Sequence, residues 1–274
     1  MSAGPAALLL ALGACASSPP PRPAAAPPAT APAAIGETFT FDSRVLGERR
    51  VINVYLPPDY ATSGARYPVL YMPDGGLKED FPHVAGAVDV SIKNAVIRPV
   101  IVVGVENTDR RHDLTAVTRT PEEQEAAPRA GGSATFRTFF RDELKPHIAA
   151  HYRTTGESGL IGESLAGHFV VETFLEEPAL FDSYIAADPS LQWNGQALAR
   201  RANALIEDLA APKQLYLANA DEPVIQAGVD VLLASLRILA PRGLRWTYEP
   251  MPAEHHHTIF PFAALRGIRT VFAP

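Results

Sequence analysis

The stretch that decides the fold is Gly159-Leu160-Ile161-Gly162-Glu163-Ser164-Leu165-Ala166-Gly167. Its first four residues have the composition of a short strand, and a helical pattern of apolar residues follows over Leu165–Leu175. A chain that turns sharply from strand to helix at a serine needs small residues two positions before and after it, because larger side chains would strike the neighbouring strand and helix. Gly162 and Ala166 meet that requirement. The pattern predicts that Ser164 is a nucleophile, and the alternative is an ordinary serine that caps the helix.

The rest of the chain alternates short apolar strands with longer helical segments. Strands are predicted at Arg50–Leu56, Tyr67–Met72, Pro99–Gly104, Gly159–Gly162, Tyr184–Ala187, Gln214–Ala218 and Leu244–Tyr248, and further helices at Ser133–His151, Gln196–Leu209 and Val224–Leu239. Helices between buried strands imply an α/β fold, with a mostly parallel central sheet and helices on both faces. No internal repeat and no second folded domain is indicated.

Composition excludes several classes of protein. The 274 residues carry 24 basic and 30 acidic side chains, a net charge of −6, and no basic stripe, so nucleic acid is not expected as a partner. A single cysteine excludes a disulfide framework and a multi-cysteine metal centre. We expect neither a metal nor a cofactor. The sequence does not indicate an oligomeric state.

The N-terminal segment has the pattern of an export signal. Residues 6–14 are apolar but too few to span a bilayer, and the length suits a signal peptide over residues 1–14. Leu12-Gly13-Ala14-Cys15 resembles the bacterial lipobox, which implies that Cys15 is lipidated. Residues 15–35 are rich in Ala and Pro and are predicted to be a tether, followed by one folded domain over 36–274. This pattern predicts an exported protein, lipid-anchored to a bacterial membrane and facing the periplasm; the alternative is a cleaved signal and a secreted protein.

A candidate base lies in the cluster Glu254-His255-His256-His257-Thr258, which follows the last predicted strand and precedes a predicted terminal helix. A neutral imidazole can remove the proton of a serine hydroxyl, and in α/β-hydrolases the histidine comes late in the chain. Adjacent histidines on an extended segment point to opposite faces, so three in a row form a poor metal site. The acid that orients the imidazole is expected after the penultimate strand, where Asp221 and Glu222 both qualify; Asp188, one strand earlier, is a third candidate.

Several motifs together resemble the "putative esterase" family of α/β-hydrolases, which includes enterobactin-type siderophore esterases, some carbohydrate esterases and the mycolyltransferases. The resemblance covers about residues 37–260. The motifs are Leu56-Pro57-Pro58-Asp59-Tyr60, Tyr67-Pro68-Val69-Leu70-Tyr71, Asp74-Gly75, Gly104-Val105-Glu106-Asn107-Thr108-Asp109-Arg110 with Asp113-Leu114-Thr115, Phe139-Phe140-Arg141-Asp142-Glu143-Leu144-Lys145-Pro146, Tyr152-Arg153-Thr154, and Pro189-Ser190-Leu191-Gln192-Trp193 beside the family's Ser-Pro-Ser-x-Trp-Trp.

The resemblance also implies roles for individual residues. Its Ala-Asn-Glu segment matches Ala220-Asp221-Glu222 and implies Glu222 as the acid, and its Glu-x-His segment implies His256 as the base. The loop Asp74-Gly75-Gly76 matches the family's oxyanion loop, so backbone N–H groups of Gly76 and Leu165 are expected to form an oxyanion hole. Substrate contacts are expected from three further residues: Asn107, Arg110 and Trp193. The family's usual elbow has His where this chain has Glu163, which leaves the substrate class open.

The function that follows is a serine carboxylic-ester hydrolase, working through an acyl-enzyme with a Ser164–His256–Glu222 triad on a small-molecule ester. Siderophore and carbohydrate esters are the substrate classes that the resemblance implies. A tri-anionic catecholate siderophore would favour a basic pocket, for which Arg110 and Arg111 are the candidates. Two alternatives remain: an acyltransferase on the same scaffold, and a non-catalytic binding lipoprotein.

Overall fold

Eight strands form one sheet in the order β1-β2-β4-β3-β5-β6-β7-β8 in the computed structural model. The structure describes residues 35–274, together with Met1 and Gly4. Most of the predicted signal peptide, nearly all of the tether, and Cys15 lie outside the described residues. No helix within the described part of the chain is long and apolar enough to cross a membrane.

The sheet and its helices alternate along the chain, as the sequence predicts. The strands are β1 (Glu37–Ser43), β2 (Glu48–Tyr55), β3 (Tyr67–Met72), β4 (Ile101–Val105), β5 (Thr154–Glu163), β6 (Ser183–Ala187), β7 (Lys213–Asn219) and β8 (Leu244–Pro250). The helices are α1 (Phe81–Lys93), α2 (Arg110–Leu114), α3 (Pro121–Ala126), α4 (Ser133–Phe139), the π-helical turn η1 (Phe140–Leu144), α5 (Lys145–His151), α6 (Leu165–Glu176), α7 (Trp193–Leu205), α8 (Pro223–Leu239) and α9 (Phe260–Val271).

Strand direction brings distant loops to one edge of the sheet. β2 runs antiparallel to β1 and β4, whereas β4, β3, β5, β6, β7 and β8 are mutually parallel. Parallel strands end at the same edge, so the loops that follow β3, β5, β6 and β7 converge there. This strand order and the mostly parallel sheet are those of the α/β-hydrolase fold, and the predicted fold class is confirmed.

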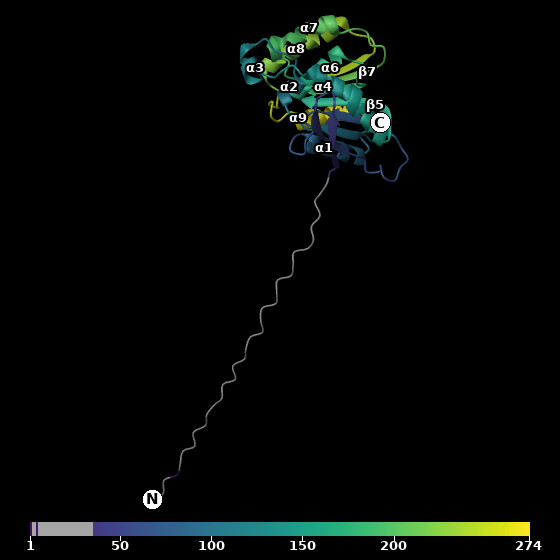
Figure 1. The fold of residues 1–274 in the computed structure, drawn as a ribbon, viewed down its shortest axis with the longest axis vertical. Coiled ribbons are helices and arrows are strands. Elements are labelled where there is room, and N and C mark those ends of the chain that lie inside the picture. Colours follow the sequence, from purple (N-terminus) through teal and green to yellow (C-terminus); the bar gives the residue numbers. More distant parts are fainter. Residues whose placement is uncertain (2–3, 5–34) are drawn as a thin grey trace. The chain divides into compact units, whose positions relative to one another are not determined.

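The two faces of the sheet carry separate apolar cores. Along β3, Val69 and Tyr71 pack into one core, whereas Leu70 and Met72 pack into the other, because successive side chains of a strand point to opposite faces. The first core is covered by α4, α6, α7 and α8, and the second by α1 and α9; Figure 1 shows α7 and α8 on the opposite side of the sheet from α1. Both layers support the edge on which the site is built.

The predicted elements are found with two differences in the helices. The segment predicted as one helix, Ser133–His151, consists of α4, η1 and α5, because Phe140–Leu144 is wound as a π-helix. The helix predicted over Gln196–Leu209 ends at Leu205, since Ile206 adopts an extended backbone. Four elements have no counterpart in the sequence prediction: β1, α1, α2 and α3.

A buried ion pair holds the loop after β4 against β2. The side chain of Arg50 is 1% exposed and that of Asp113 is 4% exposed, and the two are paired. Arg50 also pairs with Glu48 at 2.6 Å and donates to the carbonyl of Glu106 at 3.4 Å. Strand β2 is thereby tied to the segment that carries Asn107 and Arg110 toward the sheet edge.

Replacing Asp113 with Ala should lower the free energy of unfolding by about 3 kcal/mol, because it removes the buried partner of the Arg50 guanidinium and leaves only the more exposed Glu48 carboxylate to pair with it. Urea denaturation of the purified domain measures this loss. The matched control is Asp42→Ala, which breaks the exposed Arg49–Asp42 pair and should change stability little. Equal losses in the two variants would contradict the importance of the buried pair.

Candidate active site

Ser164 lies on a strained turn between β5 and α6. Its backbone has φ 58° and ψ −120°, a conformation that a residue with a side chain rarely adopts. A Cβ at Gly162 would lie 2.6 Å from the carbonyl carbon of Ala166, and one at Gly167 would lie 2.9 Å from the carbonyl oxygen of Ala187. The expected need for a small residue at Gly162 is confirmed. Ser164 lies in this turn at the carboxyl end of β5, and the residue is half-buried.

His256 is the histidine of the cluster that reaches Ser164. Its Nε2 lies 3.0 Å from Ser164 Oγ, within hydrogen-bond distance. His255 and His257 are exposed, whereas His256 is half-buried. Ser164 and His256, predicted as nucleophile and base, are 92 positions apart in the sequence, and the structure places them in contact.

The carboxylate on the other side of His256 belongs to Asp188. Its Oδ2 accepts a hydrogen bond from His256 Nδ1 at 2.5 Å, and its Oδ1 accepts one from the Ala220 N–H at 3.0 Å. Asp188 is fully buried and has φ 41°, so the chain turns abruptly after β6. Two hydrogen bonds and complete burial fix this carboxylate on the imidazole.

The prediction that Glu222 contacts His256 is wrong. Glu222 lies at the start of α8, half-buried, and forms no hydrogen bond with His256 in the described part of the chain. The fallback Asp221 is exposed, and its N–H donates to the carbonyl of Glu254 at 3.0 Å. β6 and β7 are adjacent and parallel, so acids after either strand are near the histidine, and both give the chain order Ser, acid, His.

A signal for Asp188 was present in the sequence. Beside the family's Ser-Pro-Ser-x-Trp-Trp stretch, Asp188 occupies the position of the first serine, directly after the apolar strand Tyr184–Ala187. Asp188 is the third candidate acid of the sequence, and a carboxylate in place of that serine is the signal in its favour. It is the residue that the structure places on the imidazole.

The surroundings of His256 favour its protonated form. The hydrogen bond to Asp188 is the largest influence that raises the pKa of His256, burial opposes it, and the nearby Glu163 carboxyl raises it further. Glu163 Oε1 lies 3.6 Å from His256 Nε2. Since a general base must be neutral, a raised pKa moves the acid side of any base-catalysed rate profile to higher pH.

The two backbone N–H groups expected to form the oxyanion hole differ in whether they already have a hydrogen-bond acceptor. Leu165 begins α6, and the first N–H groups of a helix have no acceptor within the helix. The Gly76 N–H, in contrast, donates to Glu79 Oε2 at 2.7 Å. Asn107 holds the same side chain, donating from Nδ2 to Glu79 Oε1 at 3.0 Å. An oxyanion can reach Gly76 only after Glu79 has moved.

Of the three expected substrate contacts, only Arg110 lines the cavity at Ser164. Arg110 forms a bidentate pair with Asp74, at 2.7 Å for each hydrogen bond. Asn107 donates to Asp74 and Glu79, and the Trp193 indole N–H donates to the carbonyl of Ala116 at 3.1 Å. Asn107 and Trp193 therefore have structural partners within the protein.

A cavity of about 560 Å³ opens at Ser164 and contains two carboxyl groups, Asp80 and Glu163. The lining residues are Asp80, His83, Arg110, Glu163, Ser164, His256, His257, Phe260 and Pro261. Burial, reinforced by nearby Asp80 and Asp74 and opposed by His256 and Arg110, raises the pKa of Glu163 to about 7. Burial and the charge of Asp74 raise the pKa of Asp80 to about 6.

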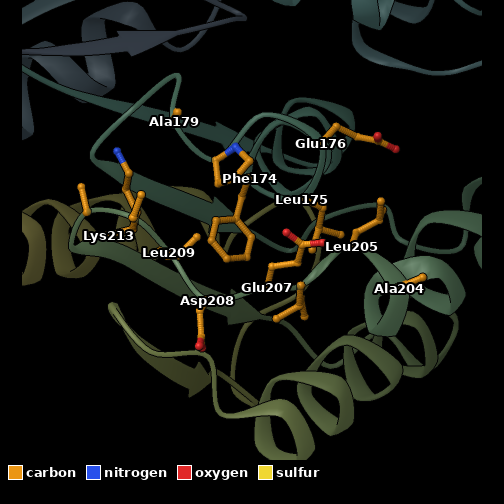
Figure 2. Close-up of a pocket in the computed structure, with 14 residues that line it drawn as sticks. Phe174, Leu175, Glu176, Ala179, Ala204, Leu205, Glu207, Asp208, Leu209 and Lys213 are labelled. Carbon is orange, nitrogen blue, oxygen red and sulfur yellow. The ribbon is translucent and has the colours of Figure 1, made fainter.

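A second cavity, of about 520 Å³, is more apolar and lies away from these residues. Figure 2 shows the Phe174 ring at its centre, with Leu205, Leu209 and Lys213 around it. Lys213 begins β7, whereas Ser164 follows the end of β5, so the two cavities lie at opposite edges of the parallel sheet. The second cavity contains none of the predicted site residues. No cluster of three or more potential metal ligands occurs within residues 35–274.

Replacing Asp188 with Asn should lower the pKa of His256, because the neutral amide no longer stabilises the imidazolium through Nδ1. The measurement is an NMR titration of the His256 ring protons, assigned by comparison with His256→Gln. The control Glu222→Gln should give a smaller decrease, since Glu222 acts on His256 only through its charge. An equal decrease in both variants would show that the Asp188 hydrogen bond does not dominate.

Known proteins are similar to this chain in sequence and in fold. The family model described as "Putative esterase" matches residues 43–244. The ferri-bacillibactin esterase BesA of Bacillus subtilis (strain 168) is 27% identical over 252 residues, which cover 83% of this chain and 86% of BesA. The crystal structure of an IroE-like serine hydrolase from Shewanella oneidensis is similar with a TM-score of 0.76 and 30% identity, over 86% of this chain and 80% of that one. The BES protein of Bacillus cereus has the same fold, with a TM-score of 0.77 at 22% identity, over 90% of this chain and 99% of that one. The chain belongs to the "Putative esterase" family, and it is a serine esterase.

Proposed function

We propose that this protein hydrolyses a small-molecule ester of the siderophore type through an acyl-enzyme on Ser164, with His256 as the base and Asp188 as the orienting acid. The observation that carries the proposal is the continuous chain of contacts from Ser164 Oγ to His256 Nε2 at 3.0 Å and from His256 Nδ1 to Asp188 Oδ2 at 2.5 Å. The names of the relatives support the substrate class: one is a ferri-bacillibactin esterase and another a siderophore enterobactin esterase from Emericella nidulans.

The geometry supports a two-step reaction. In the first step Ser164 Oγ attacks the ester carbonyl while its proton passes to His256 Nε2, and the alcohol leaves with that proton. In the second step a water molecule, deprotonated by His256, attacks the acyl-serine; the bond from the acyl carbon to Ser164 Oγ breaks, His256 returns the proton to Oγ, and the acid is released. Asp188 keeps the Nδ1 proton in place and stabilises the imidazolium that forms in each step.

The negative oxygen of each tetrahedral intermediate needs backbone donors. The Leu165 N–H at the start of α6 is one, and the positive end of the helix dipole adds to it. The Gly76 N–H becomes the second when the substrate displaces Glu79 from it. A donor of this kind contributes about 100- to 1,000-fold to the rate.

The proposed triad is tested by labelling and kinetics. A fluorophosphonate should label Ser164, and Ser164→Ala should lose about 1,000-fold or more in kcat on p-nitrophenyl butyrate. Asp188→Asn should lose roughly 1,000-fold, whereas Glu222→Gln should stay within about tenfold of the parent. A larger loss in Glu222→Gln than in Asp188→Asn would replace Asp188 by Glu222 as the acid. Label on another serine would remove the nucleophile assignment.

We also propose that Cys15 carries a lipid that anchors the esterase domain to a bacterial membrane on its periplasmic side. The support is the Leu12-Gly13-Ala14-Cys15 motif and the Ala/Pro-rich stretch that follows it. A single acyl chain binds a membrane weakly, at about 10⁴ M⁻¹, so stable anchoring requires several chains. In cell fractionation the full-length protein should sediment with membranes and Cys15→Ser should not. Retention of Cys15→Ser on the membrane as firmly as the parent would contradict the anchor.

A further inference from the structure

The cavity at Ser164 is lined by two carboxyl groups, Glu163 and Asp80, and by one arginine, Arg110. Glu163 directly precedes the nucleophile, and its carboxyl lies 3.6 Å from the imidazole nitrogen that contacts Ser164 Oγ. Its side chain is 15% exposed, so the carboxyl is partly shielded but faces the cavity. Asp80, at the start of α1, lines the same cavity. A substrate bound at Ser164 therefore meets one carboxyl group, Glu163, next to His256, and a second, Asp80, in the lining of the same cavity.

The positive charges near this cavity are already engaged. Arg110 binds Asp74 through two hydrogen bonds of 2.7 Å and donates to the carbonyl of Glu163 at 3.4 Å. Arg111, the other basic residue expected to form an anion-binding pocket, donates to the carbonyl of Ala126 at 2.7 Å and does not line the cavity. Asp74 therefore neutralises Arg110, and Arg111 lies outside the lining of the cavity, so neither arginine offers a free positive charge within it.

We infer that Glu163, together with Asp80, determines the charge class of the substrate: the site selects esters that are uncharged or cationic near the scissile bond and rejects anionic ones. This inference rests on the proposed function and narrows it. Among iron siderophores, a tri-anionic tris-catecholate complex is disfavoured, and an uncharged complex of the tris-hydroxamate kind, or one bearing amino groups, is favoured.

The physical reason is Coulomb interaction in a partly dehydrated cavity. Charges separated by several ångströms at a half-buried site interact far more strongly than they do in water. A carboxylate on the substrate would be repelled by Glu163 and would find Arg110 already neutralised by Asp74. A quaternary ammonium or amino group at the same place would be attracted. The structure therefore predicts discrimination of about tenfold or more between matched cationic and anionic substrates.

The direct test uses three p-nitrophenyl esters with acyl chains of similar length. One carries a terminal methyl group (butyrate), one a terminal carboxylate (hemisuccinate) and one a terminal trimethylammonium group. The measured quantity is the ratio of kcat/KM for the cationic ester to kcat/KM for the anionic ester at pH 8. The parent protein should give a ratio of about ten or more, and the ratio should fall as ionic strength rises.

Variants assign the selection to particular residues. Glu163→Gln should lower the ratio at least fivefold, and Asp80→Asn should lower it by a smaller factor. Glu163→His, which restores the residue usual in the family, should lower it as well. The matched control is Glu125→Gln, which removes a carboxylate from the exposed surface of α3 outside the cavity and should leave the ratio unchanged.

The pH dependence of this kcat/KM ratio shows whether the selection depends on the charge of Glu163 or only on the shape of the cavity. Because the pKa of Glu163 is raised to about 7, the parent ratio should increase as pH rises through that region. Loss of activity through protonation of His256 affects both esters equally and cancels in the ratio. The titratable and charged groups around Glu163 come from the loop after β3 and from α1, α2 and the segment before α9: Asp74, Asp80, His83, Arg110, His256 and His257. In Glu163→Gln the rise near pH 7 should disappear.

The outcomes are distinct. Hydrolysis of the neutral ester with a parent ratio near or below one would overturn the inference and leave the proposed function standing. A ratio that Glu163→Gln and Asp80→Asn leave unchanged would overturn the assignment to these residues. Failure of the parent to hydrolyse the neutral ester, with no fluorophosphonate label on Ser164, would overturn the proposed function and the inference with it.

Discussion

The close approach of backbone to backbone around Ser164 is the constraint on which the site depends. Strand β5 and helix α6 meet so tightly that a Cβ at Gly162 would lie 2.6 Å from a backbone carbon of α6. A Cβ at Gly167 would likewise lie only 2.9 Å from the carbonyl oxygen of Ala187 on β6. These two approaches hold Ser164 at a positive φ, and the hydrogen bond from its N–H to the Ala187 carbonyl, at 3.1 Å, fixes the turn on the neighbouring strand. A local strain of this kind persists only when the surrounding structure imposes it.

The same sheet edge collects the other groups because parallel strands end together. Asp188 follows β6, His256 follows β8, and the loop with Asp74 follows β3. Asp188 also accepts the N–H of Ala220 after β7, so one carboxylate joins the ends of two strands and the imidazole. The position of the His256 imidazole is thus tied to the packing of the sheet edge, because the carboxylate that contacts it is itself held between the ends of β6 and β7.

The electrostatic character of the cavity follows from which charges are paired. Asp74 neutralises Arg110, and Glu79 occupies the Gly76 N–H, so Glu163 and Asp80 are left as the groups that a substrate meets. Burial of these two carboxyls raises the pKa of each toward neutrality. Glu163 therefore has two effects: its negative charge favours the imidazolium form of His256, and it disfavours a negatively charged substrate.

The sequence by itself determined the α/β class, most strands and the turn at Ser164, because these depend on local pattern, whereas the choice of His256 among three adjacent histidines came from the resemblance to the esterase family. Strand β3 was predicted over the same residues, Tyr67–Met72, since a continuous apolar run bounded by turns is a local signal. The end of the helix after Gln196 and the π-helical turn at Phe140 were not predictable in this way, because tertiary packing decides them. Only the tertiary structure decided that Asp188, and not Glu222, contacts His256. Both acids follow adjacent parallel strands and precede the histidine, so chain order cannot separate them, and the choice depends on which carboxylate the buried turn after β6 directs at the imidazole.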